Sequence, residues 1–299
     1  MRNNTAHIEF PSRIGVWLNL EPWPIREAQA IARDIEALGF GSLFIPEGGG
    51  KDVLVESAAF LAATDRLVVG TGIANIHFRL PMPAEAGART LAALHPGRFV
   101  LGLGVSHAPF VEELLGGAYG RPLRTMRTYL ERMDSVPGEI EQGAGFARLL
   151  AALGPKMIEL SGELADGAVP YLVTPERTAV TRAILGPTKW IVSEQAVAIA
   201  RDPDDQLRRA HRHVGGYMAM QNYRDSWLRQ GFDESDLVPG GSDRLVRALV
   251  GLGSAGEAAA SVSAHLDAGA DHVLVQVLGG DPSADPRPAL REIAGALQI

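Results

Sequence analysis

The chain has 299 residues, of which 46% are hydrophobic and 21% charged, and its formal net charge is −7. This balance is typical of a globular protein, and an acidic chain without a basic run is not expected to bind nucleic acid. The absence of cysteine excludes disulfides, thiolate metal sites and a cysteine nucleophile, and it fits a cytoplasmic protein. We expect no membrane partner, since no apolar run approaches the roughly 18 residues of a membrane span, and no signal peptide at the polar N-terminus.

Short apolar segments alternate with longer amphipathic segments along the chain. The segments typical of strands are 13–19, 42–46, 67–73, 99–105, 148–153, 168–174, 189–197 and 272–278. Helices are predicted at 24–38, 52–64, 83–94, 122–135, 154–165, 175–185, 254–268 and 288–297. Eight strands, each followed by a helix, predict one α/β domain over residues 1–299, folded as a (β/α)8 TIM barrel. An open doubly wound sheet is the rival, but it usually has fewer strands in this length.

Two segments interrupt the alternation. Residues 201–252 form a long polar insertion between the seventh and eighth predicted strands, and its pattern is mostly helical. Residues 136–145 are predicted to be a surface excursion, after a glycine-rich loop at 116–120.

The fourth predicted strand ends in a titratable side chain. Residues 99–105 are apolar or glycine throughout, so both faces should be covered, and Pro109 cannot continue a central strand. His107 therefore lies at the carboxyl end of a strand, where barrels carry out their chemistry. Its imidazole, with an ordinary pKa of about 6.5, can move a proton at neutral pH, so we predict that His107 is catalytic. The alternative is a structural histidine.

Other polar residues follow neighbouring strands. Glu47 comes after the second strand and Asn75 after the third, so both should share a rim with His107. A solvated loop carboxylate and a turn residue are the alternatives for these two. Gly154, Pro155 and Lys156 begin a helix after the fifth strand, which favours an anion site, although an ordinary helix start explains them as well.

Several other motifs favour structural roles. The pairs Gly70/Gly72 and Gly102/Gly104 lack the third glycine of a dinucleotide fingerprint and are expected to serve close packing in the barrel. His211 and His213 point apart on a helix and lack a carboxylate to complete a metal site, so we expect surface positions and no metal. The aromatic residues of the insertion, Tyr217, Tyr223 and Trp227, are predicted to pack helices.

Four motifs together resemble the luciferase-like monooxygenase superfamily: residues 69–75, 78–79, 96–105 and 268–273. Within it the chain resembles most the branch of F420-dependent oxidoreductases. The resemblance implies a luciferase-type barrel with a deazaflavin ring over the carboxyl ends of the strands and a non-proline cis peptide at Gly72–Ile73. It also implies cofactor contacts from Asn75, Val105 and Ser106, and from Glu47 at a position where sugar-phosphate dehydrogenases of the family place an aspartate. Residues 154–156 correspond to the segment that holds the phosphate.

The sequence departs from those sugar-phosphate dehydrogenases at two positions. A residue that is often a catalytic histidine there is Gly48 here, and their glutamate at the end of the fourth strand corresponds to His107. The acid–base pair of that activity is therefore absent, and a different substrate is expected.

These observations predict an F420-dependent oxidoreductase that transfers a hydride to or from a small organic substrate. One alternative is an FMN-dependent monooxygenase on the same barrel, because a fold alone does not separate the two. Another is a cofactor-binding protein without catalysis, which the glycine at position 48 suggests. A homodimer is expected from the resemblance.

Overall fold

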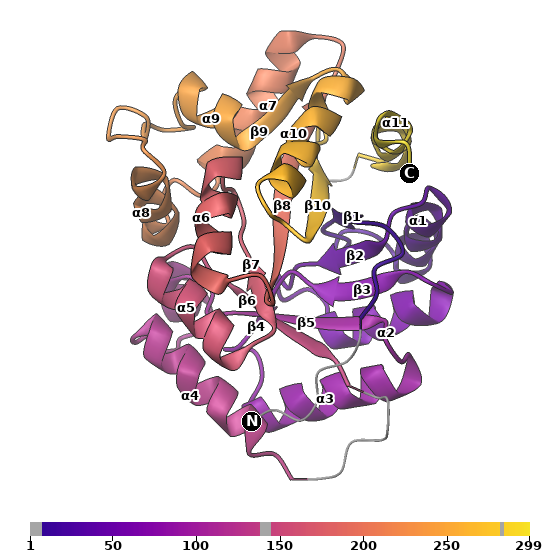
Figure 1. Ribbon diagram of the computed structural model, residues 1–299, viewed down its shortest axis with the longest axis vertical. Helices are drawn as coiled ribbons and strands as arrows, with labels where there is room; N and C mark the ends of the chain where they lie inside the picture. The colour runs from indigo at the N-terminus through magenta and orange to yellow at the C-terminus, as the bar shows by residue number, and fades with distance from the viewer. Residues whose placement is uncertain (1–7, 138–144, 282–283) are drawn as a thin grey trace.

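The structure is a computed structural model that describes residues 8–137, 145–281 and 284–299. Its centre is a closed barrel of eight parallel strands (Figure 1). In chain order these are β1 (Ile14–Trp17), β2 (Ser42–Ile45), β3 (Val68–Thr71), β5 (Phe99–Gly104), β6 (Ala147–Ala151), β7 (Gly167–Val169), β8 (Trp190–Ile199) and β10 (His272–Val277). Neighbouring strands follow this order, and β10 pairs with both β1 and β8, which closes the ring. The predicted α/β barrel, with all eight predicted strands, is confirmed.

Helices alternate with the strands and surround them, as Figure 1 shows. They are α1 (Ile25–Ala37), α2 (Val53–Ala63), α3 (Pro81–Leu94), α4 (Pro122–Asp134), α5 (Pro155–Leu164), α6 (Pro175–Leu185), α10 (Ala255–Asp267) and α11 (Arg287–Leu297). Proline in the first turn begins α3 to α6, where its fixed φ suits the helix and its missing N–H costs nothing. The side chains of Ser254 and Glu257 form the capping box that the sequence indicates for α10. No helix of the described residues has the length and apolarity needed to cross a bilayer.

The predicted helical insertion lies between β8 and β10. It contains α7 (Pro203–Gly215), α8 (Gln221–Arg229) and α9 (Asp243–Leu249), and it ends in a strand that the sequence analysis missed, β9 (Val250–Gly253). β9 pairs with residues 196–199 of β8, of which 198 and 199 lie beyond the part of β8 that pairs with β10. The exposed edge of this long strand explains why the last residues of the insertion are extended and not helical.

Two further differences lie near β5. The two-residue strand β4 (Ala74–Asn75) pairs with the end of β5, and a π-helical turn, η1 (Phe110–Leu114), lies between β5 and the glycine-rich loop predicted at 116–120. The predicted excursion at 136–145 falls mostly outside the described residues.

The barrel interior is filled by one buried cluster. It takes a residue from almost every strand, which only the inside of the barrel can bring together. Its members include Phe44, Val68, Val100, Leu149, Val169, Val192 and Leu274. Because side chains alternate along a strand, the residue two positions after Val192 also faces inward, toward the carboxyl ends of the strands. That residue is Glu194.

Candidate active site at the carboxyl ends of the strands

The predicted cis peptide at Gly72–Ile73 is present, between β3 and β4. The indole Nε1 of Trp17, at the end of β1, donates to the carbonyl oxygen of Gly72 over 2.7 Å. A Cβ at position 104 would lie 2.5 Å from Cδ1 of Ile73, so glycine is needed there for Ile73 to pack against β5. The glycines of this region thus serve close packing, as expected.

The carboxylate of Glu47 is held by an ion pair and by hydrogen bonds from neighbouring residues. Its carboxylate forms an ion pair with the Arg79 guanidinium, and its Oε2 also accepts the backbone N–H of Asn75 over 2.8 Å. The Glu47 side chain is only 1% exposed, so it is not the solvated loop carboxylate that the sequence left open. Direct contact of Glu47 with a cofactor stays a prediction, while its visible role is to hold Asn75.

Asn75 lies at the rim with its amide oriented. Its Oδ1 accepts the backbone N–H of His77 over 3.0 Å, while no described residue accepts from its Nδ2. The register places Asn75 opposite Gly104, so it lies beside the start of the Val105–Ser106 segment. Ser106 has a φ of 58°, and its carbonyl accepts the hydroxyl of Tyr119 over 3.0 Å. The third and fourth predicted strands therefore bring these predicted residues together.

His107 is half-buried at the same rim and is held by the insertion. Its Nδ1 lies 3.2 Å from Oδ1 of Asn222 on α8, and its ring lies 5.7 Å from that of Tyr223. Burial lowers the pKa of His107, and the bond to Asn222 opposes that shift. The ring is therefore neutral at pH 7, with a proton on Nδ1 when Nδ1 donates to Asn222, and Nε2 is then the nitrogen that can accept a proton.

The start of α5 has the features of an anion site. No side chain caps this helix, and Pro155 and Lys156 occupy its first turn. The Arg229 guanidinium of α8 lies 3.8 Å from the place of a Cβ at Gly154, and Arg229 has no acidic partner among the described residues. Burial, together with the charge of Arg229, lowers the pKa of nearby Arg177. The backbone N–H of Lys156 and two arginines form a donor set suited to phosphate, while the N–H groups of Met157 and Ile158 donate to the Gly154 carbonyl. The sequence analysis missed both arginines, because α6 and α8 bring them there from distant positions.

Three tyrosines, which we call the mouth tyrosines, gather at the other side of the rim: Tyr171, Tyr217 and Tyr223. The Tyr171 hydroxyl donates to Oε1 of Gln276 over 2.7 Å and accepts the Tyr217 hydroxyl over 3.0 Å. Tyr171 also lies against Trp17, with 5.5 Å between ring centroids. Tyr217 and Tyr223 pack helices, as predicted, but they do so over the barrel mouth.

His213 is not at the surface, and that prediction is wrong. Its Nε2 lies 3.5 Å from the Tyr171 hydroxyl, and burial lowers its pKa to about 4. His213 follows the buried Ala210 by three positions, which places it on the inner face of α7, and Tyr217 lies in the turn just after the end of this helix at Gly215. That spacing is the signal that could have identified His213 as buried. His211 instead bonds Asp243 over 2.9 Å, and no three possible metal ligands gather among the described residues.

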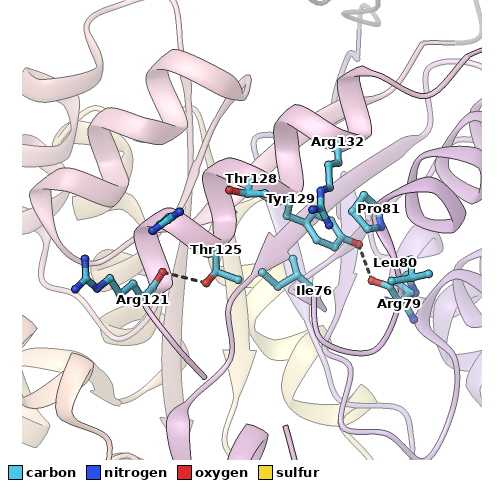
Figure 2. Close-up of a pocket in the computed structure, with 10 residues that line it drawn as sticks. Ile76, Arg79, Leu80, Pro81, Arg121, Thr125, Thr128, Tyr129 and Arg132 are labelled. Carbon is cyan, nitrogen blue, oxygen red and sulfur yellow. Dashed lines mark hydrogen bonds between the residues drawn. The ribbon is translucent and has the colours of Figure 1, made fainter. Parts of the chain in front are cut away.

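Two cavities flank the mouth. A cleft of about 540 Å³ lies at the ends of β1 and β10 beside α7, and its walls include Trp17, His213 and Gln276. A groove of about 780 Å³ lies outside the barrel, between α4 and the start of α3 (Figure 2). Figure 2 shows the arginine side chains along it and the Tyr129 hydroxyl on the Arg79 carbonyl. The groove is lined by Ile76, Arg79, Leu80, Pro81, Arg121, Arg124, Thr125, Thr128, Tyr129 and Arg132. None of the residues predicted to hold a cofactor lines this groove, although its Arg79 pairs with Glu47.

Comparisons with known proteins agree with this geometry. A family model described as luciferase-like monooxygenase matches residues 5–272. The curated protein named "Putative coenzyme F420-dependent oxidoreductase Rv3520c", from Mycobacterium tuberculosis, is 29% identical over 57% of this chain and 57% of its own length. The chain spans about half the length of the curated relatives it matches.

Solved structures show the same fold at low identity. An F420-dependent secondary alcohol dehydrogenase, in complex with an F420-acetone adduct, has a TM-score of 0.75 and 15% identity, over 95% of this chain and 98% of its own. A type II Baeyer-Villiger monooxygenase component from Pseudomonas putida, in complex with FMN, has a TM-score of 0.66 and 15% identity over 94% and 96%. The fold is therefore common to proteins that bind either cofactor.

Proposed function

The chain belongs to the luciferase-like monooxygenase family, and from that premise we propose that it is an F420-dependent oxidoreductase acting on a small organic molecule. F420 rather than FMN is favoured because the relative with 29% identity carries that cofactor in its name. A hydride to or from the substrate is the chemistry that bound F420 supplies.

The proposal depends on one observation: helix α8 contacts both His107, the candidate for proton transfer, and the anion site at Gly154. Asn222 in its first turn bonds His107, and Arg229 at its last residue reaches Gly154. Seven residues of helix separate the two by about 10 Å. A flavin-type cofactor carries its phosphate at the end of a five-carbon chain, so a proton group and a phosphate site at this spacing suit it.

The residues divide into three roles. The ring of the cofactor is assigned to Gly72, Ile73, Asn75, Val105 and Ser106. The Asn75 Nδ2 donates to the polar edge of this ring. Glu47 holds Asn75 through the backbone N–H.

Residues 154–156, with Arg229 beside them, bind the phosphate. His107 accepts or returns a proton at Nε2, and the aromatic side chains over the mouth exclude water.

A binding titration tests the cofactor. The purified protein is titrated with oxidised F420 and, separately, with FMN, while tryptophan fluorescence is followed. We expect saturable binding of F420 with a Kd at least about tenfold below that of FMN, and competition by inorganic phosphate. Tighter binding of FMN, followed by oxygen consumption when the FMN is reduced, would favour the monooxygenase alternative.

Turnover separates the enzyme from a cofactor-binding protein. Reduced and oxidised F420 are offered with a panel of carbonyls, alcohols and activated alkenes, and absorbance reports the redox state of the cofactor. Tight binding of F420 without turnover across such a panel would support the non-catalytic alternative.

A further inference from the structure

Glu194 is a buried carboxyl group inside the barrel that the proposed function does not use. It lies on β8, one inward-facing position beyond Val192 of the interior cluster, and it is only 1% exposed. Charged side chains are almost never buried to this degree without a partner of opposite charge. No ion pair of the described residues includes Glu194.

Only one of its two oxygens has a partner. Oε2 accepts the backbone N–H of Leu172 over 3.2 Å, and Leu172 adopts a left-handed conformation, with φ 51°, that directs this N–H to the carboxyl. Oε1 is buried and has no hydrogen-bond partner in the described residues. An unsatisfied buried oxygen costs about 1–3 kcal/mol, so its persistence calls for a ligand or a function.

Burial favours the neutral form of this carboxyl at neutral pH. Burial raises the pKa of Glu194 to about 8, and the Leu172 N–H only partly opposes this shift. A neutral carboxyl whose Oε2 accepts from Leu172 carries its proton on Oε1, which makes the unpartnered atom a hydrogen-bond donor.

The groups around Glu194 are those of the mouth. The titratable groups that face it are the mouth tyrosines, whose pKa values are raised by burial first and further by the charge of Glu194. From β10 comes the neutral Gln276, and His213 of α7 lies beyond the Tyr171 hydroxyl. His265 of α10 bonds Gln195 on the opposite face of β8.

Tyr171, which interacts electrostatically with Glu194, links this carboxyl to residues that line the cleft at the ends of β1 and β10. Tyr171 contacts Trp17, Gln276 and His213, and all three line that cleft. Trp17 in turn bonds Gly72, which is assigned to the cofactor ring. Tyr171 thus separates Glu194 from the residues that line the cleft, and Tyr171 and Trp17 together separate it from the ring position.

We propose that Glu194 is a ligand-binding residue of the mouth, whose Oε1 donates a hydrogen bond to an acceptor oxygen or nitrogen of the bound cofactor or substrate. The inference rests on the proposed function. The side of the mouth formed by β7 and β8 then recognises an uncharged acceptor. An anionic acceptor would be disfavoured once Glu194 ionises.

The test measures the Kd of oxidised F420 between pH 6 and pH 9 for the wild-type protein and for Glu194→Gln and Glu194→Ala. Gln keeps a donor but does not titrate. We expect wild-type binding to weaken as the pH rises through about 8, the Gln variant to lose this step, and the Ala variant to bind about threefold to tenfold more weakly at pH 6. Glu85→Gln, a buried carboxylate paired with Arg89 on the outer helix α3, is the control and should follow the wild type.

The outcomes separate the two proposals. If F420 does not bind the wild-type protein, the proposed function fails. If F420 binds and the pH step persists unchanged in Glu194→Gln, the inference about Glu194 is wrong.

A second measurement does not depend on the variants folding. Infrared difference spectra of wild-type protein labelled with ¹³C-glutamate should show a protonated carboxyl band that shifts when F420 binds. A band that is present but does not shift on binding would overturn the inference.

Discussion

The two sides of the barrel mouth differ in how completely their buried carboxyl groups are satisfied. On the side formed by β2 to β5, Glu47 pairs with Arg79 and holds Asn75, so a buried charge is compensated within the chain. On the side formed by β7, β8 and α8, Glu194 keeps an oxygen without a partner. We infer that Glu47 and Arg79 on the first side form a rigid pair, called the frame below, which orients hydrogen-bond donors. The second side can instead bind polar atoms of a ligand.

The largest expected effect comes from breaking the frame. Arg79→Ala leaves Glu47 buried and unpaired, so we expect a loss of about 3–5 kcal/mol in the free energy of unfolding, measured by urea denaturation. The control is Arg127→Ala, which removes an exposed pair with Glu163 and should cost far less stability, because water screens the pair. Equal losses in the two variants would contradict the view of Glu47 and Arg79 as a buried frame.

Substitution of Glu194 on the second side should raise the free energy of unfolding, whereas substitution of Arg79 on the first side lowers it. The folded-state pKa of Glu194, about 8, is raised above the ordinary 4.5, so between these values the folded protein binds more protons than the unfolded chain. The ionisation of Glu194 therefore lowers the free energy of unfolding as the pH rises from 4.5 to 8. The Glu194→Gln variant does not titrate at this position, so it lacks this loss. We expect its free energy of unfolding, relative to that of wild type, to rise by on the order of 4 kcal/mol between these pH values, measured by urea denaturation at each pH.

A pH-independent difference between wild type and Glu194→Gln would show that Glu194 is charged in the folded protein. Glu85→Gln, measured in parallel, accounts for the loss of a buried carboxylate outside the mouth.

His107 lies where the two sides meet, on β5's extension but held by α8. With a substrate in hand, His107→Ala should lower kcat by about 100-fold, because the proton at Nε2 is then missing. Asn222→Ala should change kcat less, because it alters only the orientation of the ring. Normal turnover of His107→Ala would remove the proton-transfer role.

The smallest effect is expected at the phosphate site. Arg229→Ala should raise the Kd of F420 by roughly tenfold, since one charge-assisted hydrogen bond among several is lost. Arg208→Ala, an exposed arginine of α7 paired with Asp205, is a matched control that should leave the Kd unchanged. An unchanged Kd in Arg229→Ala would place the anion elsewhere.

The same contrast explains what the sequence could predict. The strands and helices follow from apolar runs of the right period, and Asn75, His107 and Gly154 follow directly after strands, so local pattern was sufficient. β9 was missed because its conformation depends on the distant edge of β8. Tyr217 and Tyr223 were assigned to helix packing alone because their position over the mouth depends on how the insertion folds back over the barrel.

Glu194 carried a signal that the sequence analysis did not use. It is an acidic residue inside the segment 189–197, which was predicted as a strand because of the apolar residues 190–192 and 196–197. A carboxyl group in such a strand is either paired or functional. Which of the two applies depends on its neighbours in space, and these come from positions 172, 217 and 223.

The most direct test of the account is a crystal structure of the protein with F420 bound. We expect the phosphate at residues 154–156 beside Arg229 and the ring against Gly72, Ile73 and Asn75. A phosphate held instead by Arg121 and Arg124 in the groove between α3 and α4, with the mouth left empty, would contradict the account.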